Sequence, residues 1–205
     1  MSTYEEVIKY LNETYDPEAI IVYGSYACGD ANKNSDFDAL VIAEHDRKHD
    51  SSIIKGVVLD VFVYSAASLR AEFKPETFVQ IFDGKIVLDK NGTAAALKKR
   101  VADYIAGIPP KTDDEIREEI SWCEKMLART GREGAEGFFR WHWLLCDSLE
   151  IYFDVAKQFY FGPQKALKQM ETADPAAYSI YSSALKEMNS ESLSKWIEYI
   201  KKIET

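Results

Sequence analysis

The stretch that decides the fold of this chain runs from residue 24 to residue 38 and reads Gly-Ser-Tyr-Ala-Cys-Gly-Asp-Ala-Asn-Lys-Asn-Ser-Asp-Phe-Asp. Gly24 and Ser25 follow an apolar segment that reads as a strand, and Asp36 and Asp38 open a second one. Between them we expect the first turn of a short helix and then a polar loop. The stretch therefore predicts two strands with a pair of carboxylates at the entrance of the second.

A third aspartate extends this pattern. Asp60 lies in the middle of a further apolar segment, Gly-Val-Val-Leu-Asp-Val-Phe-Val, at residues 56–63. Because strand side chains alternate between faces, Asp36 and Asp38 point the same way while Phe37 points into the opposite layer. An unpaired carboxylate among the apolar neighbours of Asp60 would lose several kcal/mol on desolvation, and a bound metal ion would remove that penalty.

The residue types indicate what these positions bind. Carboxylate oxygens are hard ligands that suit Mg²⁺, and two such ions can hold the attacking and leaving oxygens of an in-line displacement. We predict Asp36, Asp38 and Asp60 as metal ligands and catalytic residues, with Asp60 either completing the second metal site or acting as a base. Gly24 and Ser25 are predicted to bind phosphate, since a helix N-terminus offers free N–H groups and glycine allows close approach.

Each motif also has an ordinary structural interpretation. A Gly-Ser pair after a strand is commonly only a turn, Asp-x-Asp beside a loop is commonly solvated, and Asp60 could face water on an edge strand. What favours a functional site is the order in which the motifs follow one another. That order is a strand, Gly-Ser, about ten residues, Asp-x-Asp on a second strand, and a lone aspartate on a third.

In this order the motifs resemble the nucleotidyltransferase superfamily that includes DNA polymerase β, kanamycin nucleotidyltransferase and small bacterial nucleotidyltransferase domains. Gly24, Ser25, Asp36, Asp38 and Asp60 match the family's motif residue by residue. The resemblance covers residues 18–65, and Cys28 departs from it, since small bacterial members often have arginine there. It implies a small mixed sheet in an α/β domain, followed by an all-α helical bundle. It also implies transfer of a nucleoside monophosphate from an NTP, with ATP expected, and release of pyrophosphate.

Composition sets limits on partners and location. The 205 residues are 46% hydrophobic, and the formal net charge is −9. A nucleic-acid substrate is disfavoured because it needs a basic track, and an acidic protein suits a small acceptor, including a cationic one. The apolar runs are too short for a membrane span, the N-terminus lacks a signal peptide, and three widely spaced cysteines fit a cytoplasmic protein. The oligomeric state is left open, with a homodimer among the alternatives.

The remaining sequence predicts two domains, at residues 1–108 and 112–205, with a boundary at Gly-Ile-Pro-Pro-Lys in residues 107–111. In the first domain, a capping box at Ser2 or Thr3 predicts a helix that ends near residue 15. Strands are expected at 18–23, 36–43, 56–64 and 84–89, and helices at 66–73, 75–82 and 93–106. The second domain is predicted to be helical, with helices at 112–130, 136–161, 163–172, 175–188 and 190–203.

The expected helix at 136–161 carries an apolar face and an acidic stripe. Phe138, Trp141, Leu145, Leu149, Tyr152 and Ala156 recur at helical spacing, and Phe139, Phe153 and Phe159 widen that face. The stripe of Asp147, Glu150 and Asp154 is either a solvated surface or the binding site for an acceptor amine or hydroxyl. Lys165, in the following helix, is a candidate partner of the nucleotide phosphates.

The function predicted from the sequence is therefore Mg²⁺-dependent transfer of AMP from ATP to a hydroxyl of a small-molecule acceptor. Antibiotics are acceptors that only the resemblance suggests. Two alternatives remain open. One is an antitoxin-type nucleotidyltransferase that adenylylates a partner protein, and the other is a nucleotide-binding module without catalysis.

Overall fold

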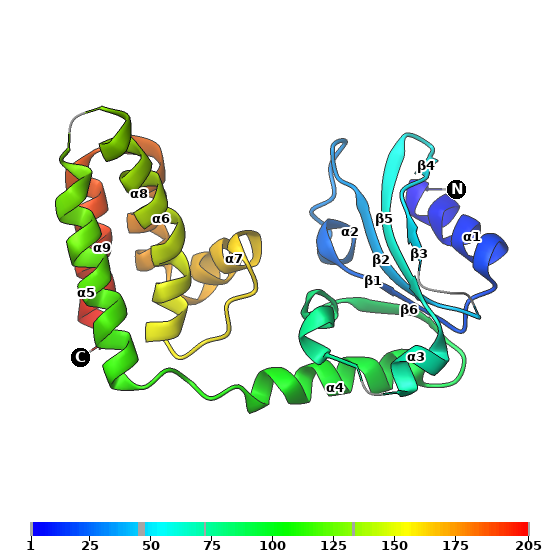
Figure 1. Cartoon of the computed structure of the whole chain (residues 1–205). Coiled ribbons are helices and arrows are strands. Elements are labelled where there is room, and N and C mark those ends of the chain that lie inside the picture. Colours follow the sequence, from blue (N-terminus) through cyan, green and yellow to red (C-terminus); the bar gives the residue numbers. More distant parts are fainter. Residues whose placement is uncertain (1, 45–47, 72, 133, 205) are drawn as a thin grey trace. The chain divides into compact units, whose positions relative to one another are not determined.

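The computed structural model describes residues 2–44, 48–71, 73–132 and 134–204. The chain divides into two compact units, Met1–Ile108 and Pro109–Thr205, each with a core of its own (Figure 1). The first unit is a mixed α/β domain and the second is helical, which confirms the predicted fold class.

The first unit contains a mixed sheet with helices on both faces. Its elements are α1 (Thr3–Tyr15), β1 (Ala19–Val22), α2 (Gly24–Cys28), β2 (Phe37–Ile42), β3 (Lys48–Asp50), β4 (Ile53–Ile54), β5 (Val57–Tyr64), α3 (Ala66–Arg70), the 3₁₀ helix η1 (Pro75–Ile81), β6 (Lys85–Asp89) and α4 (Thr93–Gly107). The short strands β3 and β4 were not predicted. The helix expected at 66–73 is wrong in length, because it ends at Arg70, and residue 72 lies outside the described residues.

The strand order in the sheet is β3-β5-β2-β1-β6, with β4 paired to β5. Strand β1 is antiparallel to both β2 and β6, and β3 and β4 are antiparallel to β5. Strands β2 and β5 are parallel and lie side by side in the middle of the sheet. This pairing brings residues 37–42 next to residues 59–64.

Alternation along the strands produces two apolar layers. Val7 and Leu11 of α1 pack with Phe37, Val41 and Val61 on one face of the sheet. The other face buries Leu40 and Ile42 against residues of α3, η1 and α4. Ser2 caps the N-terminus of α1 and forms the expected capping box with Glu5.

The second unit consists, in its described residues, of five α-helices: α5 (Asp113–Thr130), α6 (Ala135–Val155), α7 (Pro163–Ala173), α8 (Pro175–Glu187) and α9 (Ser190–Glu204). Helix α6 supplies much of the core, and Trp196 of α9 is fully buried there and donates from Nε1 to Ser148 Oγ at 2.9 Å. None of the described helices combines the length and the apolar character that crossing a membrane requires.

Candidate nucleotidyl-transfer site

The parallel pair β2–β5 places two of the predicted carboxylates on neighbouring strands. Asp38 and Asp60 are register partners in this pair. Both fall on the face of the sheet that carries Leu40 and Ile42 further along β2, and Phe62 and Tyr64 further along β5, because strand side chains alternate. The two aspartates therefore precede an apolar layer that α3, η1 and α4 cover.

The pKa of Asp38 reflects its burial and the carboxylates near it. Burial, then the charge of Asp60, then that of Asp36 raise the pKa of Asp38 from 3.8 to about 6. Burial, followed by the charges of Asp60 and Asp38, also raises the pKa of Tyr23, which directly follows β1. The charges of Asp60 and Asp36 thus both act on Asp38, and a cation beside it would relieve the repulsion.

Gly24 brings the backbone of α2 against this pair. It has a φ of +64°, and a Cβ at this position would overlap Asp38 Oδ2 and stand 2.9 Å from Asp38 Cγ. The Tyr23 N–H donates to the Asp38 carbonyl at 3.0 Å, which fixes the turn beside the carboxylate. Glycine is therefore required here both for its backbone conformation and for the space that the carboxylate occupies.

Asp36 and Ser25 lie at the margins of this group. Strand β2 begins at Phe37, so Asp36 lies just before the strand, whereas the prediction placed it within the strand. The Asp36 residue is exposed. Ser25 lies in the single turn of α2, where its carbonyl accepts from the N–H groups of Gly29 and Asp30, both at 3.0 Å.

The burial argument for Asp60 is wrong. Its side chain is 43% exposed, and its Oδ1 is 2.7 Å from His49 Nε2. The alternation of β5 buries Leu59, Val61 and Val63 but leaves the face of Asp60 half open. A histidine on an unpredicted strand therefore partners this aspartate, and a metal ion is not needed to explain its position.

Two observations bear on whether these carboxylates suit a metal ion. Among the residues that the structure describes, no three His, Cys, Asp or Glu are already grouped as metal ligands. The carboxylates on this face, Asp38 and Asp60 with Asp36 in electrostatic range, carry hard oxygens, and, after burial, the charges of Asp60 and Asp36 raise the pKa of Asp38. This chemistry suits Mg²⁺, which takes one or two carboxylates and completes its shell with water and substrate phosphates.

Comparison with protein families decides the identity of this unit. Residues 4–88 match the family model described as nucleotidyltransferase domain. The N-terminal unit is a nucleotidyltransferase domain. It belongs to the polymerase β-like superfamily that the motifs indicated, and it makes the chain an enzyme of the nucleotidyl-transfer class.

Solved structures similar to the chain include a nucleotidyltransferase-like protein from Exiguobacterium sibiricum 255-15. It is 12% identical, the match covers 98% of this chain and 72% of that one, and the TM-score is 0.38. A toxin–antitoxin structure with AMP-PNP is 18% identical over 51% of this chain and 86% of that one, with a TM-score of 0.33. At these values neither carries an argument about acceptor or partner. A comparison with curated proteins gave no match.

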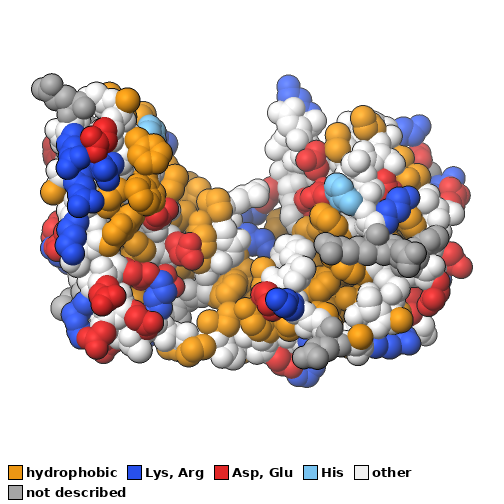
Figure 2. Space-filling model, viewed as in Figure 1, with side chains coloured by type: hydrophobic (Ala, Val, Ile, Leu, Met, Phe, Trp, Pro, Cys, Tyr) orange, Lys and Arg blue, Asp and Glu red, His pale blue; other side chains and the backbone are white. Residues whose placement is uncertain are grey.

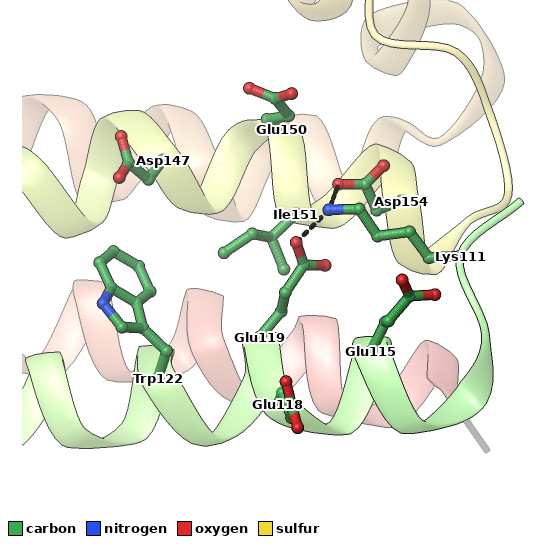
Figure 3. A pocket seen from close by; sticks show the side chains of 9 residues that line it. All are labelled: Lys111, Glu115, Glu118, Glu119, Trp122, Asp147, Glu150, Ile151 and Asp154. Atoms are coloured by element: carbon green, nitrogen blue, oxygen red, sulfur yellow. Dashed lines mark hydrogen bonds and ion pairs between the residues drawn. The ribbon is translucent and has the colours of Figure 1, made fainter.

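Outside the nucleotidyltransferase domain, the acidic stripe of α6 lines a groove of about 510 Å³ in the helical unit (Figure 3). The groove lies between α5 and α6, with Trp122 at one end and the Ile151 side chain between the two helices. Its charged residues are one lysine and six carboxylates: Lys111, Glu115, Glu118, Glu119, Asp147, Glu150 and Asp154. The three predicted acceptor residues are thus brought together with three acidic residues of α5 that the prediction missed.

Lys111 neutralises part of this charge. Its ammonium group pairs with Glu119 and, at 2.8 Å, with Asp154 (Figure 3). The Glu119 pKa is nevertheless raised, first by burial and then by the charges of Asp154 and Glu150. One lysine therefore leaves the groove with excess negative charge. Asp147 accepts from Trp143 Nε1 at 2.6 Å, while Glu150 points away from the Lys111 cluster in Figure 3.

Two features predicted for α6 are wrong. The helix ends at Val155 instead of reaching residue 161, and Lys157 follows with a φ of +55°. Of the expected apolar face, Trp141 and Leu145 are buried as predicted, but Phe138 is 67% exposed and Phe139 65%. Hydrophobic side chains accordingly appear on the surface of the helical unit in Figure 2. Periodicity therefore identified the helix and the face that it buries from Trp141 to Phe153, but not that the two phenylalanines near its start are exposed.

Lys165 is the predicted phosphate partner outside the nucleotidyltransferase domain. It lies in the first turn of α7, with its Nζ 5.6 Å from the centroid of the Phe161 ring. Its role toward a nucleotide remains a prediction.

Proposed function

We propose that this enzyme transfers the nucleoside monophosphate of ATP to a hydroxyl of a small cationic acceptor and releases pyrophosphate. The observation that carries the proposal is the register pairing of Asp38 with Asp60 directly beside Gly24. The crowded carboxylates suit a metal ion, and the backbone N–H groups of the adjacent turn suit a polyphosphate.

In this proposal Asp36, Asp38 and Asp60 hold Mg²⁺. When bound, the metal ion would neutralise the charge of the triphosphate and orient the reacting groups. Gly24 and Ser25 bind the β- and γ-phosphates through the backbone N–H groups and the Ser25 hydroxyl, and Lys165 is a further candidate contact. The acceptor oxygen forms a bond to the α-phosphorus, the bond from that phosphorus to the bridging oxygen breaks, and the hydroxyl proton leaves to solvent.

The acceptor class rests on charge. The net charge of −9 disfavours a polyanionic acceptor, and the groove of the helical unit carries six carboxylates against one lysine. Asp147, Glu150 and Asp154 bind ammonium groups of the acceptor in this proposal, and the Trp122 ring offers an apolar wall. An amino sugar has the required combination of positive charge and hydroxyl groups.

The test is a screen of candidate acceptors with ATP labelled at the α-phosphate and Mg²⁺, in which pyrophosphate release and labelled products are measured. The proposal expects label on a cationic small molecule with wild-type enzyme and none with Asp38→Asn. Label on a protein instead would indicate the antitoxin-type alternative. ATP binding without pyrophosphate release across the screen would favour the non-catalytic module.

A further inference from the structure

His49 lies where it can control the orientation of Asp60. It is the central residue of β3, and its register partner in the antiparallel pair with β5 is Phe62. Asp60 is two residues from Phe62 and therefore on the same face, within diagonal reach of a long side chain. The contact between His49 Nε2 and Asp60 Oδ1, at 2.7 Å, has the length of a strong hydrogen bond.

The imidazole is fixed independently of Asp60. Its ring stacks on Phe62, with 4.7 Å between ring centroids and 27° between planes. The next residue, Asp50, is only 4% exposed, and it accepts from the hydroxyls of Tyr10 at 3.1 Å and Tyr15 at 2.6 Å. These bonds anchor β3 to α1. His49 is therefore a pre-positioned donor and not a side chain drawn in by the aspartate.

Asp60 needs such a donor because its neighbour repels it. Asp38 is its register partner and carries the same charge, while the Asp60 side chain is 43% exposed. Without a restraint, a half-exposed carboxylate turns toward water and away from a like charge. A hydrogen bond from His49 Nε2 holds Oδ1 of the carboxylate and leaves Oδ2 to bind a metal ion.

We propose that His49 is a positioning residue that holds the Asp60 carboxylate beside Asp38 so that the two bind a divalent metal ion together. This inference rests on the proposed function, because it assumes that Asp38 and Asp60 are metal ligands. Partners that orient a metal-binding side chain typically contribute 10- to 100-fold to metal affinity. The contrary possibility is that the hydrogen bond competes with the metal, in which case removing His49 strengthens binding.

The experiment measures the affinity of the full chain for Mn²⁺ alone, by titration calorimetry or from the electron paramagnetic resonance signal of free Mn²⁺. His49→Phe keeps a ring on Phe62 but removes the donor, and His49→Gln keeps a donor without the ring. We expect Mn²⁺ affinity to fall at least about 10-fold in His49→Phe and to recover most of that loss in His49→Gln. His142→Ala, a histidine change in the helical unit, is the control and should bind Mn²⁺ like wild type.

Equal or tighter Mn²⁺ binding by folded His49→Phe overturns the inference. If that variant does not fold, as judged by circular dichroism, His49→Gln and His49→Asn decide instead. The inference is supported if His49→Gln binds Mn²⁺ as tightly as wild type and His49→Asn binds it more weakly. Equal Mn²⁺ affinities of wild type and both variants overturn it. Asp38→Asn separates this result from the proposed function. Should wild type and Asp38→Asn bind Mn²⁺ alike, the metal site itself is wrong, and the role of His49 is overturned with it.

Discussion

The carboxylate of Asp38 occupies the space that a side chain on Gly24 would need. Both residues lie where β1 and β2 are tied by the hydrogen bond from Tyr23 N–H to the Asp38 carbonyl. Gly24 therefore couples the geometry of the turn after β1 directly to that of the Asp38 carboxylate.

Gly24→Ala is expected to reduce both stability and nucleotidyl transfer. The new Cβ must push Asp38 aside, in addition to the left-handed backbone penalty of about 1–2 kcal/mol. Gly29→Ala is a matched control, because Gly29 has a φ of +84° and a Cβ added there would meet nothing within 4 Å. Urea unfolding and labelled-ATP transfer measure both effects. The coupling is refuted if the two alanine variants lose the same activity.

Asp36→Ala and Asp38→Ala are each expected to abolish nucleotide transfer while the fold remains intact. Loss of metal-assisted charge stabilisation is worth several kcal/mol, which corresponds to a rate loss of about 10²-fold or more. Pyrophosphate release measures the rate and circular dichroism the fold. Transfer at the wild-type rate in either variant would show that the carboxylates are assigned the wrong role.

The raised pKa of Asp38 predicts a pH dependence of stability in the metal-free protein. Because the folded state holds the proton more tightly than the unfolded chain, the free energy of unfolding falls as pH rises from about 4 to about 6, and this contribution then levels off. Asp38→Asn removes this component. Urea unfolding with a chelator at pH 4, 5, 6 and 7 should show the variant gaining on wild type across this interval, and parallel curves would contradict the shift.

Asp50 is predicted to be a structural carboxylate. Burial raises its pKa, but hydrogen bonds from Ser52, Tyr15 and Tyr10 outweigh burial and lower it overall. Its stabilisation is therefore present above the ordinary pKa of an aspartate and is lost as pH falls through the lower folded value. Asp50→Asn should lose about 2–3 kcal/mol at pH 7, since hydrogen bonds to charged groups contribute about 1.5–3 kcal/mol.

The control for this change is Asp103→Asn, which removes an exposed carboxylate paired with Lys99. Exposed pairs contribute less than about 1 kcal/mol, so this variant should unfold close to wild type. Similar losses in the two variants would mean that the Asp50 network does not anchor β3.

The groove of the helical unit predicts a charge effect on acceptor binding. Glu150→Gln removes one carboxylate whose side chain lies apart from the Lys111 pairs, so the groove keeps its internal contacts. We expect the acceptor KM to rise about three- to tenfold with little change in kcat, as for a lost binding contact. Glu171→Gln on α7, outside the groove, is the control. An unchanged KM in Glu150→Gln speaks against this groove as the acceptor site.

Sequence reasoning predicted the main strands and helices because their signals are local. Apolar alternation, the capping box at Ser2 and the prolines at the starts of α7 and α8 act within a few residues. Strands β3 and β4 escaped because they are only three and two residues long and exist by pairing with β5. Their stability comes from tertiary contacts such as those of Asp50, which no local pattern encodes.

For the candidate site, the sequence pointed to individual residues but not to their arrangement in space. The spacing of Gly24, Asp36, Asp38 and Asp60 identified these residues, but not that β2 and β5 are parallel neighbours. His49 was missed, since its partner lies 11 residues away on another strand. The sequence around His49, a polar residue between two charged ones, is too short to distinguish a strand from a loop. The α5 side of the acidic groove was missed because only folding brings two helices together.

The parallel register of β2 and β5 limits how this domain can change in length. Inserting one residue into β5 ahead of Asp60 would transfer that carboxylate to the opposite face, into the layer packed by α1. An insertion of two residues would restore the face but displace Asp60 along the strand, away from Asp38. Descendants of this sequence can therefore vary the polar loop at residues 29–35, whereas insertions and deletions within β5 should be excluded in any lineage that keeps the enzyme active.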